Sequence, residues 1–557
     1  MPVVTFGVAQ LRRLVGKELA PAALAESLAA LGGEASEVTP DQVTMEYFPN
    51  RPDLLTIEGA ARALRAFLGI RPGLPPIEVA KPRTELRVDS SVNEVRDYAA
   101  LCFVRGVKLD DAAVQSLIDA QEKLTLGMGR RRRKVAIGLH DAAGLKGPFT
   151  YTTLGPRDKP FVPLGGTRAM TPNEIISLHV KGQEYGHLIP MPGPAVERRF
   201  PAFLDGAGEV LSLPPIINAQ RTAVTARTRD ILVDVTGTDA RAVRQSAALL
   251  AANLAERGGA IEAVTVHDTS GTWTCPDLRP VESTLHMDDV KALLGLDLDG
   301  AEAAQALARM GHGAEPFGNK VLVRSPPWRF DLLHPVDILE DVAIGVGYDK
   351  IPTDLPKTQT FGARLPAQRL EDRLRSLLIG HGWSEAMALT LSDAASQWGR
   401  WGEKSQAAVT LRNPVVEEQT LLRTRLVPGL LGMLAQNRHR SLPQRLFEVG
   451  HVVVRDGAAW RNRLHLGVVE VDAKADFSAM RGLAESLVRD ARLPLTLAPG
   501  ERPGFIPGRE GELRHGGRAV GHFGELHPET VARFGLGAAT VALELELAGL
   551  APGPQRA

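Results

Sequence analysis

Segments with the periodicity of strands and of helices alternate along the whole chain of 557 residues, and no segment repeats in tandem. This alternation is the feature that most limits the possible folds, because it is typical of proteins that combine helices and sheets. At roughly 150 residues per domain, a chain of this length forms about four domains. The sequence therefore predicts a multidomain α+β protein.

Composition and periodicity place the boundaries of four units. Four prolines within residues 71–82 are typical of a linker, so the first unit, an α+β domain, is predicted over residues 1–80. The second unit is predicted over residues 85–270 and the third over residues 277–352. The last unit, residues 360–555, again alternates helices and strands.

The overall composition excludes several classes of protein. Lys and Arg together number 65 and Asp and Glu also number 65, which excludes a polybasic membrane binder or a nucleic-acid coat. Cys102 and Cys275 are too few for a disulfide framework or a cysteine-rich zinc site, which predicts a reducing cytoplasm. No run approaches the ~18 apolar residues of a membrane span, and the N-terminus lacks the pattern of a secretory signal.

The strongest local motif is a set of four acidic residues beside one predicted helix: Asp331, Asp337, Glu340 and Asp341. Pro335 suits the first turn of that helix, which is predicted to end near Gly345 or Gly347. The last three carboxylates then lie on one face, and Asp331 can fold back onto it. With only Arg329 nearby, the four would repel one another, and Mg²⁺ would relieve that repulsion. The alternative is a solvated acidic face at the helix N-terminus.

Two further segments place small polar side chains where a ligand could bind. Ser212 and Asn218 flank two prolines that follow a strand pattern, and Asp234 and Thr236 lie in a later segment. The alternative is an ordinary turn, in which the residues after Thr236 form an Asx-type turn or the N-cap of a helix.

A run of five basic residues, Arg130 to Lys134, precedes an apolar strand that ends in His140 and Asp141. The run could contact phosphate groups, or it could be a solvated loop. An isolated histidine is more often structural than ligand-binding, so His140 is expected to have a structural role.

Motifs spread over nearly the whole chain occur in the order found in one protein family. They span residues 48–53, 58–62, 134–141, 161–164, 181–188, 212–218, 234–239, 328–352, 413–414, 447–450 and 524–528. In these segments the chain resembles the beta subunit of phenylalanine–tRNA ligase, in its shorter archaeal and eukaryotic form. Residues 142–147 follow the family pattern less closely.

The resemblance implies an (αβ)₂ heterotetramer that uses ATP to attach phenylalanine to tRNA(Phe), with no DNA or membrane partner. The four predicted units then correspond to an N-terminal α+β domain, a B3/B4-type editing domain, a winged-helix-like B5 domain and a class II synthetase-like antiparallel-sheet core. The Mg²⁺ ligands of the family map onto four positions in a site shared with the α subunit: Asp331, Asp337, Glu340 and Asp341.

The resemblance also implies a division of labour between the subunits. Class II catalysis needs an arginine clamp on the ATP phosphates, but the glycine-rich residues 535–537 are followed by no arginine before Arg556. The C-terminal core is therefore expected to lack the catalytic motifs, and the α subunit is expected to carry out aminoacylation. This chain would bind α, position the tRNA and edit mischarged tRNA.

Editing has a physical reason, because an apolar pocket cannot strongly reject a substrate that merely adds a hydroxyl, as tyrosine does relative to phenylalanine. A second site that hydrogen-bonds the phenol could hydrolyse the error, and four residues are predicted to form it: Ser212, Asn218, Asp234 and Thr236. No nucleophilic triad is evident, so an activated water is expected to attack. A stand-alone editing hydrolase and a non-catalytic tRNA-binding paralogue are the alternatives.

Overall fold

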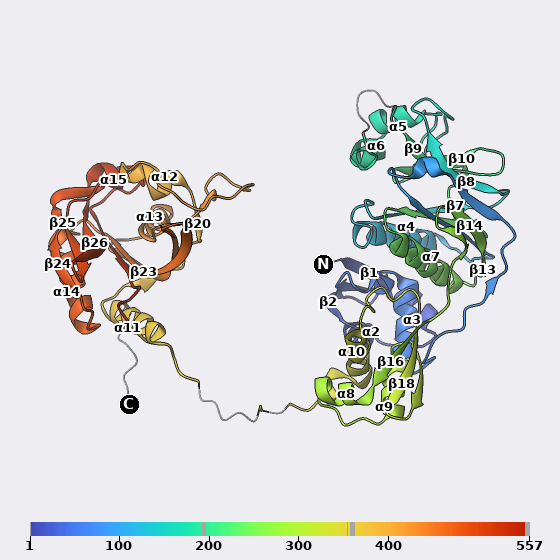
Figure 1. The fold of residues 1–557 in the computed structure, drawn as a ribbon, viewed down its shortest axis with the longest axis horizontal. Coiled ribbons are helices and arrows are strands. Elements are labelled where there is room, and N and C mark those ends of the chain that lie inside the picture. Colours follow the sequence, from blue (N-terminus) through green and yellow to red (C-terminus); the bar gives the residue numbers. More distant parts are fainter. Residues whose placement is uncertain (1, 192–196, 354, 357–361, 552–557) are drawn as a thin grey trace. The chain divides into compact units, whose positions relative to one another are not determined.

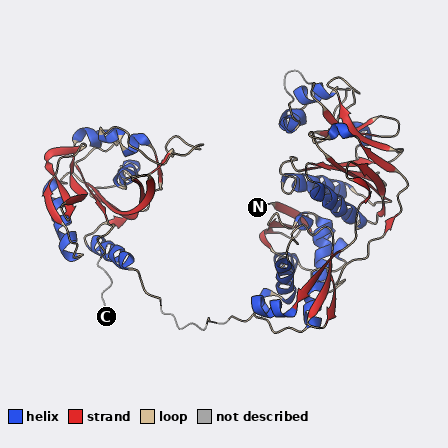
Figure 2. Cartoon of the chain, in the orientation of Figure 1, coloured by secondary structure: helices blue, strands red, loops and turns tan. Residues whose placement is uncertain are grey.

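The computed structural model describes residues 2–191, 197–353, 355–356 and 362–551. Its contacts divide the chain into two compact units, Met1–Leu355 and Pro356–Ala557, and each is described by itself (Figures 1 and 2). The first three predicted domains therefore pack together as one compact unit. No helix among the described residues is long and apolar enough to cross a membrane.

The N-terminal part of the first unit combines a small sheet with three helices. The strands lie in the order β1 (Val3–Gly7), β3 (Gln42–Tyr47) and β2 (Gly33–Val38). The helices are α1 (Val8–Val15), α2 (Pro21–Ala29) and α3 (Ile57–Phe67). The Thr56 hydroxyl caps α3, because it accepts a hydrogen bond from the Gly59 N–H at 3.1 Å.

Two larger sheets follow the N-terminal part in the sequence and lie at one end of the first unit (Figure 1). The smaller has the strand order β4 (Val79–Ala80), β13 (Ala260–Glu262), β6 (Tyr98–Arg105), β12 (Ile231–Gly237) and β7 (Val135–Asp141). The larger has the order β11 (Ile217–Asn218), β10 (Val210–Leu213), β9 (Phe200–Leu204), β8 (Phe149–Leu154), β5 (Glu85–Val88), β14 (Val264–Asp268) and β15 (Gly271–Cys275). Four helices accompany them, namely α4 (Asp111–Leu126), α5 (Pro172–Leu178), α6 (Val180–Tyr185) and α7 (Ala240–Ala255).

Strand β12 lies in the interior of the smaller sheet. It pairs with β6 on one side and with β7 on the other, and helix α7 packs against it. Every residue of β12 is buried, as its apolar run Ile-Leu-Val suggests. Asp234, in the middle of this strand, is therefore a buried carboxylate, and such a group needs hydrogen-bond partners.

The last part of the first unit has three strands in the order β16 (Val281–His286), β18 (Lys320–Ser325) and β17 (Gly313–Phe317). Its helices are α8 (Met287–Leu294), α9 (Gly300–Arg309) and α10 (Pro335–Val346). Helix α10 confirms the prediction from sequence, because it begins at Pro335 and ends before Gly347, whose φ is 106°. A side chain at Gly345 would lie 2.2 Å from the carbonyl oxygen of Ala306, so glycine lets α10 approach α9 closely.

The second unit is built on a sheet of seven strands. Their order is β19 (Ser384–Glu385), β22 (Gln444–Asp456), β23 (Ala459–Val471), β27 (Thr540–Glu546), β26 (Arg518–Leu526), β25 (Phe505–His515) and β24 (Thr496–Pro499). All neighbours are antiparallel except β19 and β22. The other elements are β20 (Leu391–Ser392), β21 (Leu421–Leu422), α11 (Pro366–Gly380), α12 (Ala394–Gln397), α13 (Val427–Gln436), α14 (Phe477–Asp490) and α15 (Pro528–Arg533).

A carboxylate from the sheet of the second unit caps one of its helices. Glu544 of β27 accepts hydrogen bonds from the backbone N–H groups of Leu426, at 2.9 Å, and Val427, at 3.2 Å, at the start of α13. His465 Nδ1 lies 2.9 Å from the same carboxylate. Burial alone would raise the pKa of Glu544, but His465 and the backbone donors hold it at about 2.

We expect Glu544→Gln to lower the free energy of unfolding by about 1–3 kcal/mol at neutral pH, because a buried charge-assisted cap is lost. A carboxylate with a depressed pKa contributes stability that is present above its ordinary pKa and is lost as the pH falls, so wild-type stability should decrease below about pH 4.5 more steeply than that of the variant. Chemical denaturation across this pH range measures both effects. The exposed Glu529→Gln is the control, and equal pH slopes for wild type and Glu544→Gln would contradict this role.

Candidate functional site

A cavity of about 530 Å³ opens in the first unit beside helix α4, strand β7 and the connection between β10 and β11. Its wall is largely aliphatic, with side chains that include Leu117, Ile137 and Leu139. Nine polar or charged side chains also line the cavity, and such groups fix the orientation of a small apolar or aromatic ligand. Three of the four residues predicted for the editing pocket, Ser212, Asn218 and Asp234, line the cavity.

The sheet register brings these three residues together. In the hairpin of β10 and β11, Ser212 pairs with Asn218, and the Asn218 side chain donates to the Leu139 carbonyl of β7 at 3.2 Å. Asp234 of β12 pairs with Gly138 of β7. A Cβ atom at position 138 would lie 2.5 Å from Asp234 Oδ2, so the glycine leaves room for the carboxylate.

A buried hydrogen-bond chain holds the Asp234 carboxylate. Ser212 Oγ donates to Asp234 Oδ2 at 2.9 Å, and His140 Nε2 lies 2.7 Å from the same oxygen. The other ring nitrogen, His140 Nδ1, lies 2.8 Å from Thr222 Oγ1. Asp234 Oδ1 accepts no hydrogen bond from any described residue, so it is the oxygen that a ligand in the cavity can engage.

His140 and Thr222 are members of the site that sequence reasoning missed. His140 was expected to be structural, yet it directly contacts the cavity carboxylate. The available indication was its position two residues after Gly138 on β7, since alternate residues of a strand face the same side. Thr222 lies in a short turn after β11, and no local pattern marks it.

Thr236, the fourth predicted pocket residue, does not line the cavity. Its hydroxyl accepts a hydrogen bond from Arg96 Nε at 2.8 Å, and its carbonyl accepts one from Arg96 Nη2 at 2.8 Å. Burial lowers the pKa of Arg96 to about 10. In the structure the Arg96 guanidinium, not the cavity, lies against the polar atoms of Thr236.

Positive charge gathers beside the cavity. Arg130, Arg131 and Arg132 adopt left-handed backbone conformations, with φ of 49°, 53° and 66°. Arg132 lines the cavity and donates from Nη1 to two backbone carbonyls of the β10–β11 connection, at 2.9 and 3.0 Å. Arg130, Arg131 and Arg133 are exposed and form no ion pair with any described residue. Their charges are therefore available to an anionic partner.

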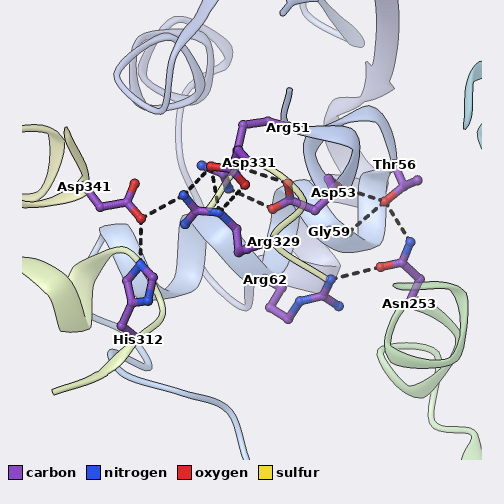
Figure 3. Close-up of polar contacts among 10 residues, drawn as sticks. All are labelled: Arg51, Asp53, Thr56, Gly59, Arg62, Asn253, His312, Arg329, Asp331 and Asp341. Carbon is purple, nitrogen blue, oxygen red and sulfur yellow. Dashed lines mark hydrogen bonds and ion pairs between the residues drawn. The ribbon is translucent and has the colours of Figure 1, made fainter. Parts of the chain in front are cut away.

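The four carboxylates predicted to bind Mg²⁺ do not gather at one point. Asp331 and Asp341 both pair with Arg329, at 2.6 and 2.7 Å, and Asp341 also lies 2.6 Å from His312 Nε2 (Figure 3). Asp337 accepts hydrogen bonds from the backbone N–H groups of Leu333 and His334.

Glu340 is exposed and forms no ion pair with any described residue. Among the described residues, no group of three or more His, Cys, Asp or Glu side chains is arranged to hold a metal. The donor set around Asp331 and Asp341 therefore does not fit Mg²⁺.

The physical reason is that cations of the protein already neutralise these carboxylates. Burial alone would raise the pKa of Asp341, but Arg329 and His312 hold it at about 2. In the same way, Asp341 and Asp331 raise the pKa of Arg329 despite its burial. The sequence-based hypothesis counted Arg329 as the only nearby partner, and it could not include the hydrogen bond from His312 to Asp341, because His312 comes from a separate segment.

This ion-pair cluster joins parts of the first unit that are distant in sequence (Figure 3). Arg51 forms a two-point ion pair with Asp53, at 2.7 and 2.9 Å. The charge of Asp53 helps to raise the pKa of Arg329, and the charge of Arg51 helps to lower the pKa of Asp341. Arg62 donates to the side-chain oxygen of Asn253 on α7 at 3.0 Å. Asn253 in turn donates to the Thr56 hydroxyl at 3.0 Å.

Profiles of three domain families match the chain. Their descriptions are the B3/4 domain, over residues 103–264, the tRNA synthetase B5 domain, over residues 283–348, and the phenylalanyl tRNA synthetase beta chain CLM domain, over residues 351–547. The cavity lies within the B3/4 match, and the four carboxylates lie within the B5 match.

Whole proteins match over almost their full lengths. The phenylalanine–tRNA ligase beta subunit of Methanothrix thermoacetophila is 39% identical over 553 residues, covering 98% of this chain and 100% of that protein. The corresponding subunit of Archaeoglobus fulgidus is 38% identical, covering 98% of each. The crystal structure of an N-terminal fragment of the phenylalanyl-tRNA synthetase beta subunit from Pyrococcus horikoshii matches with a TM-score of 0.59 and 35% identity, covering 62% of this chain and 99% of the fragment.

We expect Asp341→Asn to lower the free energy of unfolding by about 3–5 kcal/mol, because it leaves the buried Arg329 without one of its carboxylates. Glu340→Gln, on the same helix but exposed, should change it by less than about 0.5 kcal/mol. Denaturation with Mg²⁺ and with EDTA measures both variants. If the carboxylates bound Mg²⁺, both variants would lose similar stability, and only when Mg²⁺ is present. That result would contradict the charge-pair role.

Proposed function

The chain belongs to the family of phenylalanine–tRNA ligase beta subunits, and from this membership we propose that its B3/4 cavity hydrolyses tyrosine esterified in error to tRNA(Phe). The observation that carries the proposal is the Asp234 carboxylate, which lines an otherwise largely aliphatic cavity and has one oxygen free of partners. The aliphatic wall suits an aromatic ring, and the free Oδ1 suits a phenolic hydroxyl.

A carboxylate acceptor can distinguish tyrosine from phenylalanine, which an aminoacylation site that selects by shape alone cannot do well. Tyrosine would donate its hydroxyl to Asp234, whereas phenylalanine would leave the buried carboxylate without that bond. A site built to hydrogen-bond a hydroxyl rejects the analogue lacking it far more strongly than an apolar pocket rejects the hydroxyl. The cavity can therefore bind the mischarged ester and release the correct one.

The geometry supports attack by water rather than by a protein nucleophile. Asp234 lies between Ser212 and His140, whereas in a nucleophilic triad the histidine lies between the serine and the carboxylate. Ser212 gives its proton to Asp234, so its oxygen can accept a hydrogen bond from a ligand or a water. No residue is assigned as the general base.

The exposed arginines beside the cavity suit the phosphates of the tRNA acceptor end. A single strand that enters the cavity carries one negative charge per nucleotide, and Arg130, Arg131 and Arg133 have charges free to meet it. Arg132 has a different role, because its bonds to the β10–β11 connection fix the wall of the cavity.

We propose that aminoacylation itself takes place on the α subunit of an (αβ)₂ assembly in the cytoplasm, with ATP as its substrate. The support is the C-terminal sheet, which matches the CLM domain but has no arginine after the glycines at 535 and 537 until Arg556. No step is assigned to Mg²⁺ at Asp331 or Asp341, because Arg329 and His312 occupy those carboxylates. Charging of tRNA(Phe) by this chain alone would contradict the division of labour.

In the complex with α, we expect Asp234→Asn to slow hydrolysis of tyrosyl-tRNA(Phe) by about 10- to 150-fold, because a charge-assisted hydrogen bond contributes about 1.5–3 kcal/mol. Charging with phenylalanine should stay within about 2-fold. Asp239→Asn, outside the cavity at the N-cap of α7, is the matched control, since Asn caps as well as Asp. Deacylation at the wild-type rate would remove Asp234 from the reaction.

We expect the double variant Arg130→Ala and Arg131→Ala to raise the KM for mischarged tRNA with little change in kcat. Each lost phosphate contact should also reduce the slope of log affinity against log salt concentration by about 0.7. Deacylation kinetics at several salt concentrations measure both effects, with the exposed Arg279→Ala as the control. An unchanged salt slope would assign these arginines to a solvated loop.

A further inference from the structure

We infer that His140 is a positioning residue for the editing reaction, which fixes the Asp234 carboxylate so that a single oxygen meets the amino acid. The inference rests on the proposed editing function and deepens it. His140 does not line the cavity, so it acts through Asp234 and not on the substrate.

The first argument is that His140 connects three segments that meet only in the folded protein. The residue is fully buried, with 0% of its surface exposed, and it lies on β7. Its Nε2 lies 2.7 Å from Asp234 on β12, and its Nδ1 lies 2.8 Å from Thr222, in the turn after β11. Both ring nitrogens have buried partners, so the imidazole is fixed in one orientation.

The second argument is a count of hydrogen-bond capacity at Asp234. Oδ2 meets both Ser212 Oγ, at 2.9 Å, and His140 Nε2, at 2.7 Å, and these two contacts match the two lone pairs of that oxygen. The carboxylate therefore cannot rotate without breaking two buried bonds. The oxygen left for the ligand is always Oδ1, and its direction is set before the ligand arrives.

The third argument concerns the role of Thr222. Its Oγ1 lies 3.2 Å from the Ala219 carbonyl, which can only accept a hydrogen bond, as well as 2.8 Å from His140 Nδ1. The Thr222 hydroxyl proton has two acceptors within reach, the Ala219 carbonyl and His140 Nδ1. An imidazole that donates from Nε2 to Asp234 accepts at Nδ1, and the Thr222 hydroxyl is the donor at that nitrogen, so the turn that carries Thr222 fixes the orientation of the ring.

A histidine that merely fills the core would not need these partners. An apolar side chain of similar size would fill the same volume, but it would leave Asp234 Oδ2 with Ser212 alone and remove the partner of Thr222. The two roles can be separated with amides of different length. A glutamine places its nitrogen near the position of Nε2, whereas an asparagine reaches only the position of Nδ1.

The test compares His140→Gln with His140→Asn in the complex with α, by measuring kcat and KM for hydrolysis of tyrosyl-tRNA(Phe) and of phenylalanyl-tRNA(Phe). The positioning role predicts that Asn lowers kcat/KM for the tyrosyl ester by about 10- to 100-fold and narrows the ratio between the two esters. His140→Gln should keep most of the wild-type kcat/KM and most of the ratio between the two esters, because glutamine can still donate to Asp234. Thr222→Val should give an intermediate loss of the same selectivity.

Several results would overturn the inference. Equal losses for Gln and Asn, accompanied by equally lowered melting temperatures, would make His140 a structural residue. If both His140 variants keep wild-type selectivity and Asp234→Asn still slows hydrolysis, the role of His140 is rejected and the proposed function is retained. A wild-type complex that does not hydrolyse tyrosyl-tRNA(Phe) at all would reject the proposed function, and the inference with it.

Discussion

The buried charge of Arg329 is the constraint on which the first unit depends. A guanidinium taken out of water is costly unless carboxylates surround it, and Asp331, before α10, and Asp341, within α10, both pair with it. Arg51 and Asp53 of the N-terminal part extend this cluster, and Arg62 links it to α7 through Asn253. Charge neutrality in the interior therefore holds together segments from three parts of the sequence.

The cavity and the ion-pair cluster both contain buried charged groups, but these groups are paired in different ways. Around Arg329, almost every charge is matched within the protein. At Asp234, the hydrogen bonds are placed on one carboxylate oxygen and the other is left free. A carboxylate oxygen that lines a cavity and has no partner within the protein is typical of sites where a ligand supplies the bond.

Local features were predictable from the sequence, and long-range ones were not. Helix α10 follows from Pro335 and Gly347, because caps depend on adjacent residues. The sequence grouped Ser212, Asn218 and Asp234, and all three line the cavity. Thr236 was grouped with them, and strand alternation cannot reveal that Arg96 donates a hydrogen bond to its hydroxyl.

The metal hypothesis shows the same limit. Helical spacing correctly put acidic side chains on α10, but the repulsion between them depends on cations and hydrogen-bond partners elsewhere in the chain. His312 lies on a different segment, and Arg51 is still more distant in sequence. The site members His140 and Thr222 were missed for the same reason, because each is defined by a partner that only the sheet register brings near.

A carboxylate with one free oxygen recognises a hydrogen-bond donor and not a particular atom. Within the proposed function, a ring bearing an amino group in place of the phenol would satisfy Asp234 Oδ1 and be removed from the tRNA. A ring bearing fluorine or a methoxy group offers no proton and would pass as phenylalanine does. The chemistry of a single oxygen thus sets which artificial amino acids a ribosome supplied by this enzyme could incorporate at phenylalanine codons.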